Sequence, residues 1–316
     1  NNTGPAEHRT QMIELYDPAD VDHALRLMLI DRESYRKLAS VKKDLFKGTI
    51  TTQYSRKELS DGSRRRWGRL YVSNGVGYQA IKGVWRRLLG YRFYHDLDFA
   101  DCALTCLRQI CHTHGIPCPA LLWLQKNRDA ILELGDRASL KRAINCVVFG
   151  GAGYVPQLTA IGDAAAEELE RELRELLLSK LPLEINAICG ALANIPIFQE
   201  ELAAAQTVGA DALSEGAAGS VESVPKTENA RDALEEDGIG ANPANVMGRF
   251  LSYVLQRRED EALSALQVFL SQKGFSADLR GALVFDGIQV ERKEPLPRGF
   301  RGQLPLFPPE LLDEAS

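Results

Sequence analysis

One set of side chains, spaced four residues apart, indicates chemistry on phosphates. The set is Arg137, Lys141, Asn145 and the pair Phe149-Gly150. Residues at this spacing lie along one side of an α-helix, so the cations, the amide and the ring would form one strip. The cations would neutralise the phosphates of a nucleoside triphosphate, whereas Asn145 and Phe149 would lie beside its sugar and base. An ordinary helix with a solvated basic side explains the same spacing, because short motifs also match by chance.

Two aspartates, one on each side of this strip in the sequence, suit a divalent metal. Asp98 lies in a predicted strand, Phe93 to Phe99, and Asp286 lies in the predicted hairpin Leu283 to Val290. Hard cations prefer carboxylate oxygens, and a pair of them can activate a hydroxyl and hold a leaving pyrophosphate. A plain structural role for Asp286 stays open, because Asp-Gly between apolar strands is a strong turn signal.

A cation-rich stretch precedes the first aspartate. Its net positive charge and interleaved aromatic rings are typical of segments that contact a nucleic-acid backbone, although a solvated basic loop remains an alternative. The chain as a whole has a net charge of −5, so any such surface would be local. The cations are Arg56, Lys57, Arg64, Arg65, Arg66, Arg69, Lys82, Arg86, Arg87 and Arg92, and the aromatic residues are Tyr54, Trp67, Tyr71, Tyr78 and Trp85.

These segments, taken in order, resemble the conserved blocks of family A DNA polymerases, over roughly residues 64 to 292. The arginine strip has the spacing of that family's motif B. The other blocks are similar to the segment before the palm (Gly68-Arg69-Leu70, Ser73, Gln79 and Ile81), to motif A (Leu97-Asp98-Phe99-Ala100) and to motif C (Val284-Phe285-Asp286-Gly287).

The resemblance implies a role for each block. Asp98 and Asp286 would bridge two Mg²⁺ or Mn²⁺ ions, and Arg137 would stabilise the triphosphate. Lys141 would do the same and would also donate a proton to the pyrophosphate. The implied partners are nucleoside triphosphates and a DNA primer-template, with no membrane. The implied primer-template contacts are Arg69, Ser73 and Gln79, and the implied nucleotide contacts are Arg137, Lys141, Asn145, Phe149 and Gly150.

Departures from the family pattern keep other functions open. Ala103 stands where the family has a glutamate that screens the sugar, so a primase or single-subunit RNA polymerase that uses ribonucleotides is one alternative. Gly287 stands where motif C has a second carboxylate, so an inactive nucleic-acid-binding module is another. A helical scaffold unrelated to polymerases would make the ordered blocks a coincidence.

The predicted fold class is α+β, a right-hand polymerase core with an antiparallel palm sheet, helical fingers and a short helical thumb. The expected segments, in order, are a thumb-like helical region (1–66), a first palm segment with motif A (67–112), fingers (113–200), a flexible acidic insertion (201–243), and a second palm segment with motif C and a Pro-rich tail (244–316).

The apolar spacing predicts four further helices, over residues 17 to 47, 121 to 134, 164 to 181 and 246 to 272. Gly135-Asp136 is the expected turn and cap before the arginine strip, and Gly150 would let the backbone bend after it.

Composition favours a soluble protein of 316 residues from a reducing compartment, whether nuclear, cytosolic, organellar or viral, and not a secreted one. The six cysteines form no CxxC pair. A zinc site around Cys106, Cys111, His112, His114 and Cys118 does not match finger or ribbon spacing, so buried free thiols are the preferred interpretation. The first residue, Asn1, suggests a processed chain or a fragment.

Overall fold

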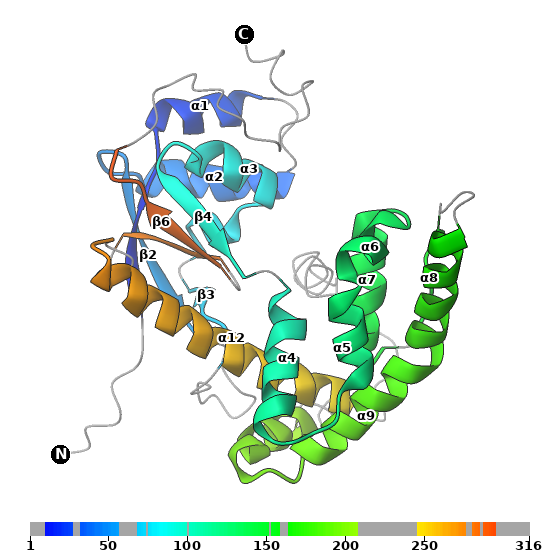
Figure 1. Ribbon diagram of the computed structural model, residues 1–316. Helices are drawn as coiled ribbons and strands as arrows, with labels where there is room; N and C mark the ends of the chain where they lie inside the picture. Colours follow the sequence, from blue (N-terminus) through cyan, green and yellow to red (C-terminus); the bar gives the residue numbers. More distant parts are fainter. Residues whose placement is uncertain are drawn as a thin grey trace, which may run out of the picture. The chain divides into compact units, whose positions relative to one another are not determined.

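The computed structural model has an α+β fold, mostly helical, with two small antiparallel sheets (Figure 1). It describes residues 10–27, 32–56, 68–73, 75–99, 101–151, 153–158, 164–207, 245–275, 280–284 and 287–294. The chain divides into two compact units. Unit 1 contains Asn1–Ser55, Leu70–Asp98 and Leu263–Ser316, and unit 2 contains Arg56–Arg69 and Phe99–Ala262. This division by packing differs from the five consecutive segments expected from the sequence.

Unit 1 contains all the described strands. These are β1 (Thr10–Leu15), β2 (Thr49–Ser55), β3 (Tyr71–Val72), β4 (Tyr94–Asp98), β5 (Gly281–Val284) and β6 (Gly287–Glu291). They form two antiparallel sheets, with strand orders β1-β2-β3 and β4-β6-β5. Val284 pairs with Gly287, so β5 and β6 form the predicted hairpin, and β4 is the predicted strand that ends at Asp98. Both predictions are confirmed.

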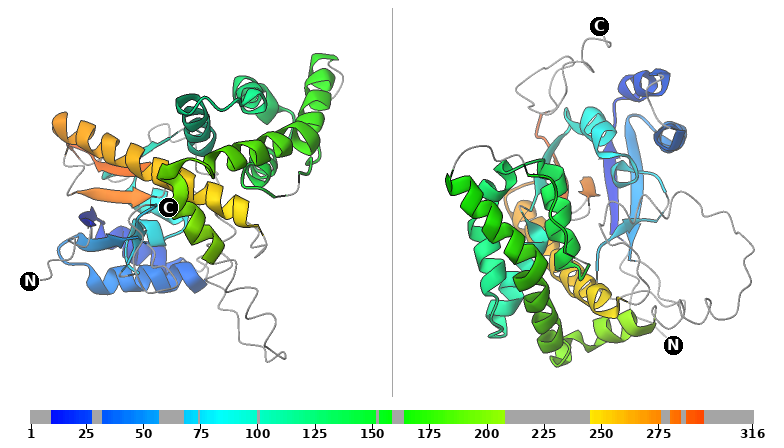
Figure 2. Two further views of the ribbon diagram at one scale, coloured as in Figure 1. Left: turned by 90° about the horizontal axis from the view of Figure 1, so that it is seen from below. Right: turned by 90° about the vertical axis from the view of Figure 1, so that its right-hand side faces the viewer.

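Three helices pack with these strands in one core. They are α1 (Pro18–Arg26), α2 (Arg32–Asp44) and α3 (Gly83–Gly90), and Figure 2 shows α1 and α2 beside β1 and β2. The helices contribute Val21, Leu38, Val41 and Leu89, all of which are buried. The helical region predicted for residues 17 to 47 is therefore confirmed as α1 and α2, whereas the flanking strands β1 and β2 were not predicted.

A fully buried carboxylate lies inside unit 1. Glu14 on β1 accepts hydrogen bonds from the Tyr54 hydroxyl (2.6 Å), the Tyr16 hydroxyl (3.0 Å) and the backbone N–H of Tyr78 (2.7 Å). The rings of Tyr16 and Tyr78 stack with their centroids 4.2 Å apart. Burial raises the pKa of Glu14 from its ordinary 4.5 to about 7, and the hydrogen bonds only partly oppose this.

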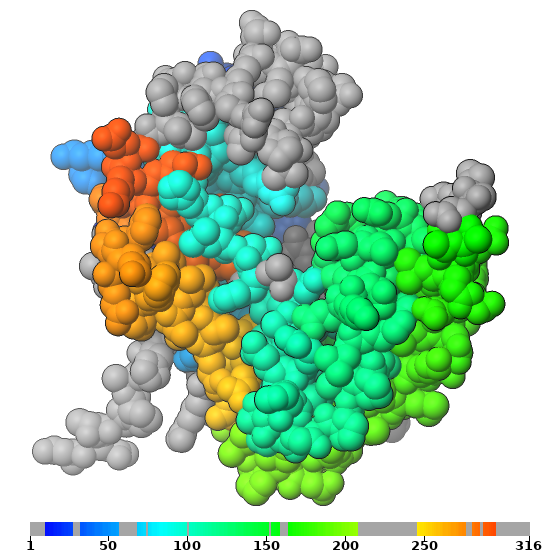
Figure 3. Space-filling view, in the orientation of Figure 1, coloured from blue at the N-terminus to red at the C-terminus, as the bar shows by residue number. Residues whose placement is uncertain are grey.

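Unit 2 is helical among its described residues, and Figure 3 shows α4 to α9 as one packed body. The helices are α4 (Cys102–Thr113), α5 (Pro119–Lys126), α6 (Arg128–Glu133), α7 (Arg137–Val148), α8 (Ala164–Glu175), α9 (Leu181–Leu192) and α12 (Val246–Gln272). A single π-type turn, Leu176–Lys180, joins α8 to α9, and a 3₁₀ turn, Pro196–Phe198, leads into helical residues 199–207. Residues 246–262 of α12 belong to unit 2 and residues 263–272 to unit 1.

The helical predictions for this unit are confirmed with two adjustments. The helix predicted over 121–134 is divided at Asn127 into α5 and α6, and the one predicted over 164–181 continues through the π-type turn into α9. Residues 201–207 of the predicted insertion are helical, with Glu201 and Ala205 buried, whereas residues 208–243 lie outside the described residues.

One interhelical contact fixes the start of α5. Pro119 occupies the first helical position, and the N–H groups of Ala120 and Leu121 donate to the two carboxylate oxygens of Glu184 on α9, at 2.7 and 2.9 Å. These N–H groups have no partner within the helix, so Glu184 satisfies them and places negative charge at the positive end of the helix dipole.

In the described part of the chain, no single helix is long and apolar enough to cross a membrane. One sharply bent pair, Ala164–Leu192 with Pro196–Thr207, meets the criteria by length and composition only.

Candidate functional site

The helix α7 presents the predicted strip on its exposed side. Its first turn is capped by Asp136, whose carboxylate accepts a hydrogen bond from the Ser139 N–H at 2.8 Å. Arg137, Lys141 and Asn145 are exposed. The opposite side of the helix is buried in the unit 2 core through Leu140, Ala143, Ile144, Val147 and Val148. The helix, its cap and the shared exposed side of these three residues agree with the sequence prediction.

The cations of this strip have no acidic partner among the described residues. Neither Arg137 nor Lys141 forms an ion pair there, and both are open to solvent. Two cations about one helical turn apart can bind a polyanionic group when no carboxylate of the described residues competes for them. The neighbouring Arg142 is also exposed but lies outside the four-residue spacing, which makes it a useful comparison residue.

The end of α7 turns sharply at Gly150. Its φ of +74° is in the left-handed region, where glycine is favoured, and the turn is closed by Gly150 N–H to Val147 (2.9 Å) and Gly151 N–H to Cys146 (2.7 Å). The predicted bend after the helix is confirmed. Phe149 at this turn is partly buried against the unit 2 core.

Asn245, at the start of α12, holds this turn. Its side-chain N–H₂ donates to the carbonyl oxygens of Phe149 (3.3 Å) and Gly150 (2.9 Å), and its side-chain oxygen accepts from Gly248 N–H (2.7 Å). A Cβ at Gly248 would lie 2.3 Å from the Phe149 oxygen, so the close approach of the two helices needs glycine there. The role of Asn245 was not predicted, because its partners lie about a hundred residues away in the sequence.

Asp98 is exposed at the end of β4 in unit 1, directly opposite Gly287 of β6. An exposed carboxylate on a strand end suits a hard cation such as Mg²⁺. The second predicted ligand, Asp286, lies outside the described residues. Among the residues that are described, no group of three or more His, Cys, Asp or Glu gathers to hold a metal ion.

The backbone explains why position 287 carries no side chain. A Cβ on Gly287 would lie 2.7 Å from the carbonyl oxygen of Leu97 and 3.3 Å from a carboxylate oxygen of Asp98. A glutamate at this position, as motif C would have, therefore does not fit without a shift of β4.

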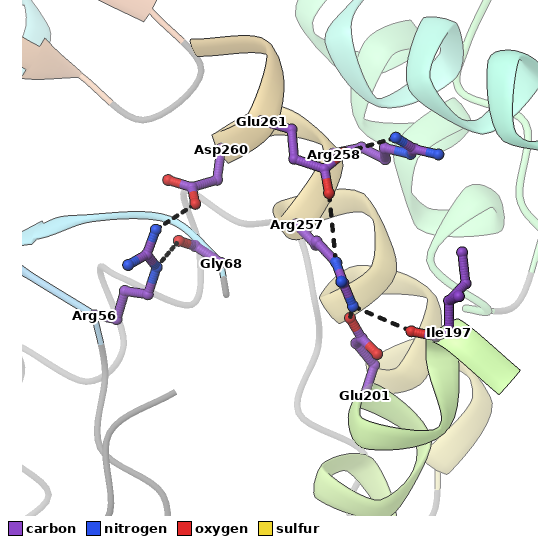
Figure 4. A network of polar contacts seen from close by, with 8 residues as sticks. All are labelled: Arg56, Gly68, Ile197, Glu201, Arg257, Arg258, Asp260 and Glu261. Atoms are coloured by element: carbon purple, nitrogen blue, oxygen red, sulfur yellow. Dashed lines mark hydrogen bonds and ion pairs between the residues drawn. The ribbon is translucent and has the colours of Figure 1, made fainter. Parts of the chain in front are cut away.

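Arg69 is held by an acidic partner within unit 2. Its Nε lies 2.7 Å from a carboxylate oxygen of Glu259 on α12, and the two side chains are only 16% and 3% exposed. Next to it, Arg56 pairs with Asp260 at 2.5 Å and donates to the Gly68 carbonyl at 3.2 Å (Figure 4). These contacts join both flanks of residues 57–67 to one turn of α12.

The same stretch of α12 carries a second ion-pair network (Figure 4). Arg257 pairs with the fully buried Glu201 at 2.7 Å, donates to the Ile197 carbonyl and approaches Glu261 at 3.4 Å. Both networks could have been suspected from the charged run Arg257-Arg258-Glu259-Asp260-Glu261. The sequence alone does not show which residues pair with it.

The other two predicted primer-template residues lie in unit 1. Gln79 is buried, and its amide accepts from Val72 N–H (2.8 Å) and donates to the Leu70 carbonyl (2.9 Å). Its polar atoms therefore support the chain locally. Ser73 is exposed, and its hydroxyl donates to the Gln53 carbonyl at 3.0 Å. Ala103, the predicted sugar-selecting residue, is partly buried on α4 in unit 2.

The structure thus brings Arg137, Lys141 and Asn145 together on α7, with Phe149 and Gly150 at its end, and presents Asp98 on a separate unit. Comparison of the chain with protein-family models found no match, and comparison with curated proteins found none either.

Proposed function

We propose that this chain is a template-directed DNA polymerase with a right-hand core. It would transfer a nucleotide from a deoxynucleoside triphosphate to the 3′-hydroxyl of a primer. The observation that carries the proposal is the exposed face of α7, where Arg137 and Lys141 have no acidic partner among the described residues. The exposed Asp98, at the end of a strand in a β-hairpin sheet, supports it independently.

In this reaction the primer 3′-hydroxyl loses its proton to water and its oxygen attacks the α-phosphorus. The bond from the α-phosphorus to the oxygen that bridges to the β-phosphorus breaks, and pyrophosphate leaves with the electron pair. Bound Mg²⁺ ions, held by Asp98 and Asp286, would supply charge neutralisation for the attacking and leaving oxygens. Arg137 and Lys141 would bind the triphosphate, and Lys141 would donate a proton to the leaving pyrophosphate. Asn145 would contact the sugar, and Phe149 and Gly150 would border the base. Ser73 would contact the primer-template, Arg69 would border it while paired with Glu259, and Gln79 would support the chain beside Ser73.

Primer extension on a labelled primer-template with Mg²⁺ or Mn²⁺ tests this proposal. Asp98→Ala and Asp286→Ala should each lower extension about 100-fold or more, because each removes a metal ligand. Lys141→Ala should lower kcat/KM about 10- to 100-fold through a lost charged contact, whereas the matched Arg142→Ala should change it little. Extension that survives both aspartate substitutions would contradict the proposal.

Two observations favour specific alternatives. The small side chain of Ala103 favours ribonucleotide use, so a primase or single-subunit RNA polymerase would extend with rNTPs in preference to dNTPs in the same assay. The closed space at Gly287, which excludes a second motif C carboxylate, favours an inactive module. That module would bind the primer-template without extending it under either metal.

A further inference from the structure

The helix α2 of unit 1 has a strongly cationic exposed face. Arg32, Arg36 and Lys43 are exposed, whereas Ser34, Leu38 and Val41 on the opposite side are buried. Residues 32–44 contain five cations and two acids, a net charge of +3, although the whole chain carries −5. Positive charge is therefore concentrated on α2, although the chain as a whole is negative.

Most of these cations are not neutralised internally. In the described part of the chain, Arg32, Arg36 and Lys43 form no ion pair. Lys42 pairs with Asp22 at 2.8 Å, but both side chains are largely open to solvent, so the pair is screened and weak. A solvated face would explain the charge alone.

Two aromatic rings on the same segment go beyond what a solvated face requires. Tyr35 is 48% exposed and Phe46 is 69% exposed. The ammonium group of Lys47 lies 5.2 Å from the centre of the Phe46 ring. Exposed rings among unpaired cations match the combination that binds single-stranded nucleic acid, in which bases stack on rings while cations contact phosphates.

The apolar side of α2 decides against a lipid surface. An amphipathic helix binds a membrane by burying its apolar face among the acyl chains. Here that face, with Leu38 and Val41 both fully buried, packs into the core of unit 1. Only the cationic face with its separate rings remains for a partner, and this favours phosphates and bases.

We propose that the α2 surface, made by Arg32, Tyr35, Arg36, Lys43 and Phe46, binds single-stranded nucleic acid. The helix is about 20 Å long, enough for several nucleotides. The inference concerns binding alone and does not depend on nucleotidyl transfer.

The test is fluorescence anisotropy with a labelled oligothymidine, without metal or nucleotide, at several salt concentrations. The double variant Arg36→Gln/Lys43→Gln should weaken binding about tenfold or more. The slope of log K against log salt is negative, and the double variant should reduce its magnitude by about 1.4, because each of the two lost phosphate contacts contributes about 0.7. Tyr35→Ala and Phe46→Ala should each weaken binding about tenfold and leave the salt slope unchanged, since stacking releases no counterions.

The matched control is Lys126→Gln/Lys180→Gln, which removes the same charge from exposed positions in unit 2. It should leave affinity and salt slope as in the unchanged protein. All the substituted positions are exposed, and the unfolding temperature should confirm that each variant is folded.

Equal effects of the two double variants, or no oligothymidine binding by the unchanged chain, would overturn the proposal. Tighter α2-dependent binding to phosphatidylserine vesicles than to the oligonucleotide would assign the surface to a membrane instead. The oligothymidine assay contains neither metal nor nucleotide, so a chain that fails to extend a primer can still bind the oligothymidine through α2, and the two proposals can fail separately.

Discussion

The buried Glu14 makes the stability of unit 1 depend on pH. Its folded-state pKa of about 7 lies above its ordinary 4.5, so the folded chain binds the proton more tightly than the unfolded chain does. Stability from this group is therefore full below about pH 4.5, falls as the pH rises, and is lost above about pH 7. The shift corresponds to about 3 kcal/mol.

Glu14→Gln should remove this pH dependence, because glutamine stays neutral and its amide oxygen can accept a hydrogen bond from the Tyr54 hydroxyl, as Glu14 does. Urea unfolding of both proteins between pH 4.5 and about pH 7 checks it. The free energy of unfolding of the unchanged chain should fall relative to that of the variant by about 3 kcal/mol. Parallel pH profiles would show that Glu14 titrates normally in the fold.

Gly287→Ala should destabilise the chain by about 1 to 3 kcal/mol, because the new Cβ would press on the Leu97 carbonyl. Gly190→Ala is the control, since nothing lies within 4 Å of a Cβ at that exposed helical position. This control should be neutral or stabilising by up to about 1 kcal/mol. Thermal unfolding of both variants measures the difference in stability. Equal stabilities would show that β4 shifts to make room for the Cβ of residue 287 without destabilising the fold.

At the scale of elements, Glu184 joins α9 to the start of α5. Glu184→Ala leaves the N–H groups of Ala120 and Leu121 without their carboxylate partner, and should cost about 1 to 3 kcal/mol. Glu172→Ala removes an exposed glutamate from α8 and should change the free energy of unfolding by less than about 0.5 kcal/mol. Chemical denaturation compares them, and similar losses would mean that water replaces the Glu184 contacts.

Elements with a clear hydrophobic period were predictable from the sequence. The helix over 246–272 has the predicted bounds, and the Asp-Gly hairpin signal placed β5 against β6. The strands β1 and β2 were missed because polar residues occupy their buried positions. Glu14 and Thr52 are fully buried beside Met12, Ile50 and Tyr54, so the alternation that marks a strand is hidden in a hydropathy pattern.

In the candidate site, too, local features could be predicted from the sequence and tertiary contacts could not. The shared exposed face of Arg137, Lys141 and Asn145 follows from helical spacing, which is local. The pairing of Arg69 with Glu259 joins residues 190 apart in sequence, and tertiary packing selects such partners. Sequence reasoning placed Arg69 at a nucleic acid without knowing that a buried carboxylate already holds it.

At the scale of the whole molecule, the thiols distinguish the two units. All six cysteines lie among the described residues of unit 2; five are buried, and Cys146 is partly exposed. Burial raises the pKa of Cys111 and that of Cys189 to about 12, which suppresses the reactive thiolate. In the native protein a thiol reagent should react rapidly with Cys146 at most, and with all six cysteines in denaturant.

Glu184→Ala should increase the rate at which the five buried cysteines react, because that substitution loosens unit 2, whereas Glu14→Gln in unit 1 should leave this rate unchanged. The absorbance of the chromophore that the reagent releases measures the reaction. Two or more rapid thiols in the unchanged, folded chain would contradict the observed burial.

The pairing of β4 with β6 also has a consequence during protein synthesis. Within its described sheet, β4 hydrogen-bonds only to β6, and Asp98 lies opposite Gly287. This pairing cannot form until the ribosome has translated Gly287. At ribosomal speeds of about 5 to 20 residues per second, this delay is on the order of ten seconds or more. Residues 99–262, most of the intervening stretch, belong to unit 2, so that unit can fold before β6 is made. During this interval the backbone N–H and C=O groups of the nascent β4 lack their partners on β6 and are open to pairing with another chain.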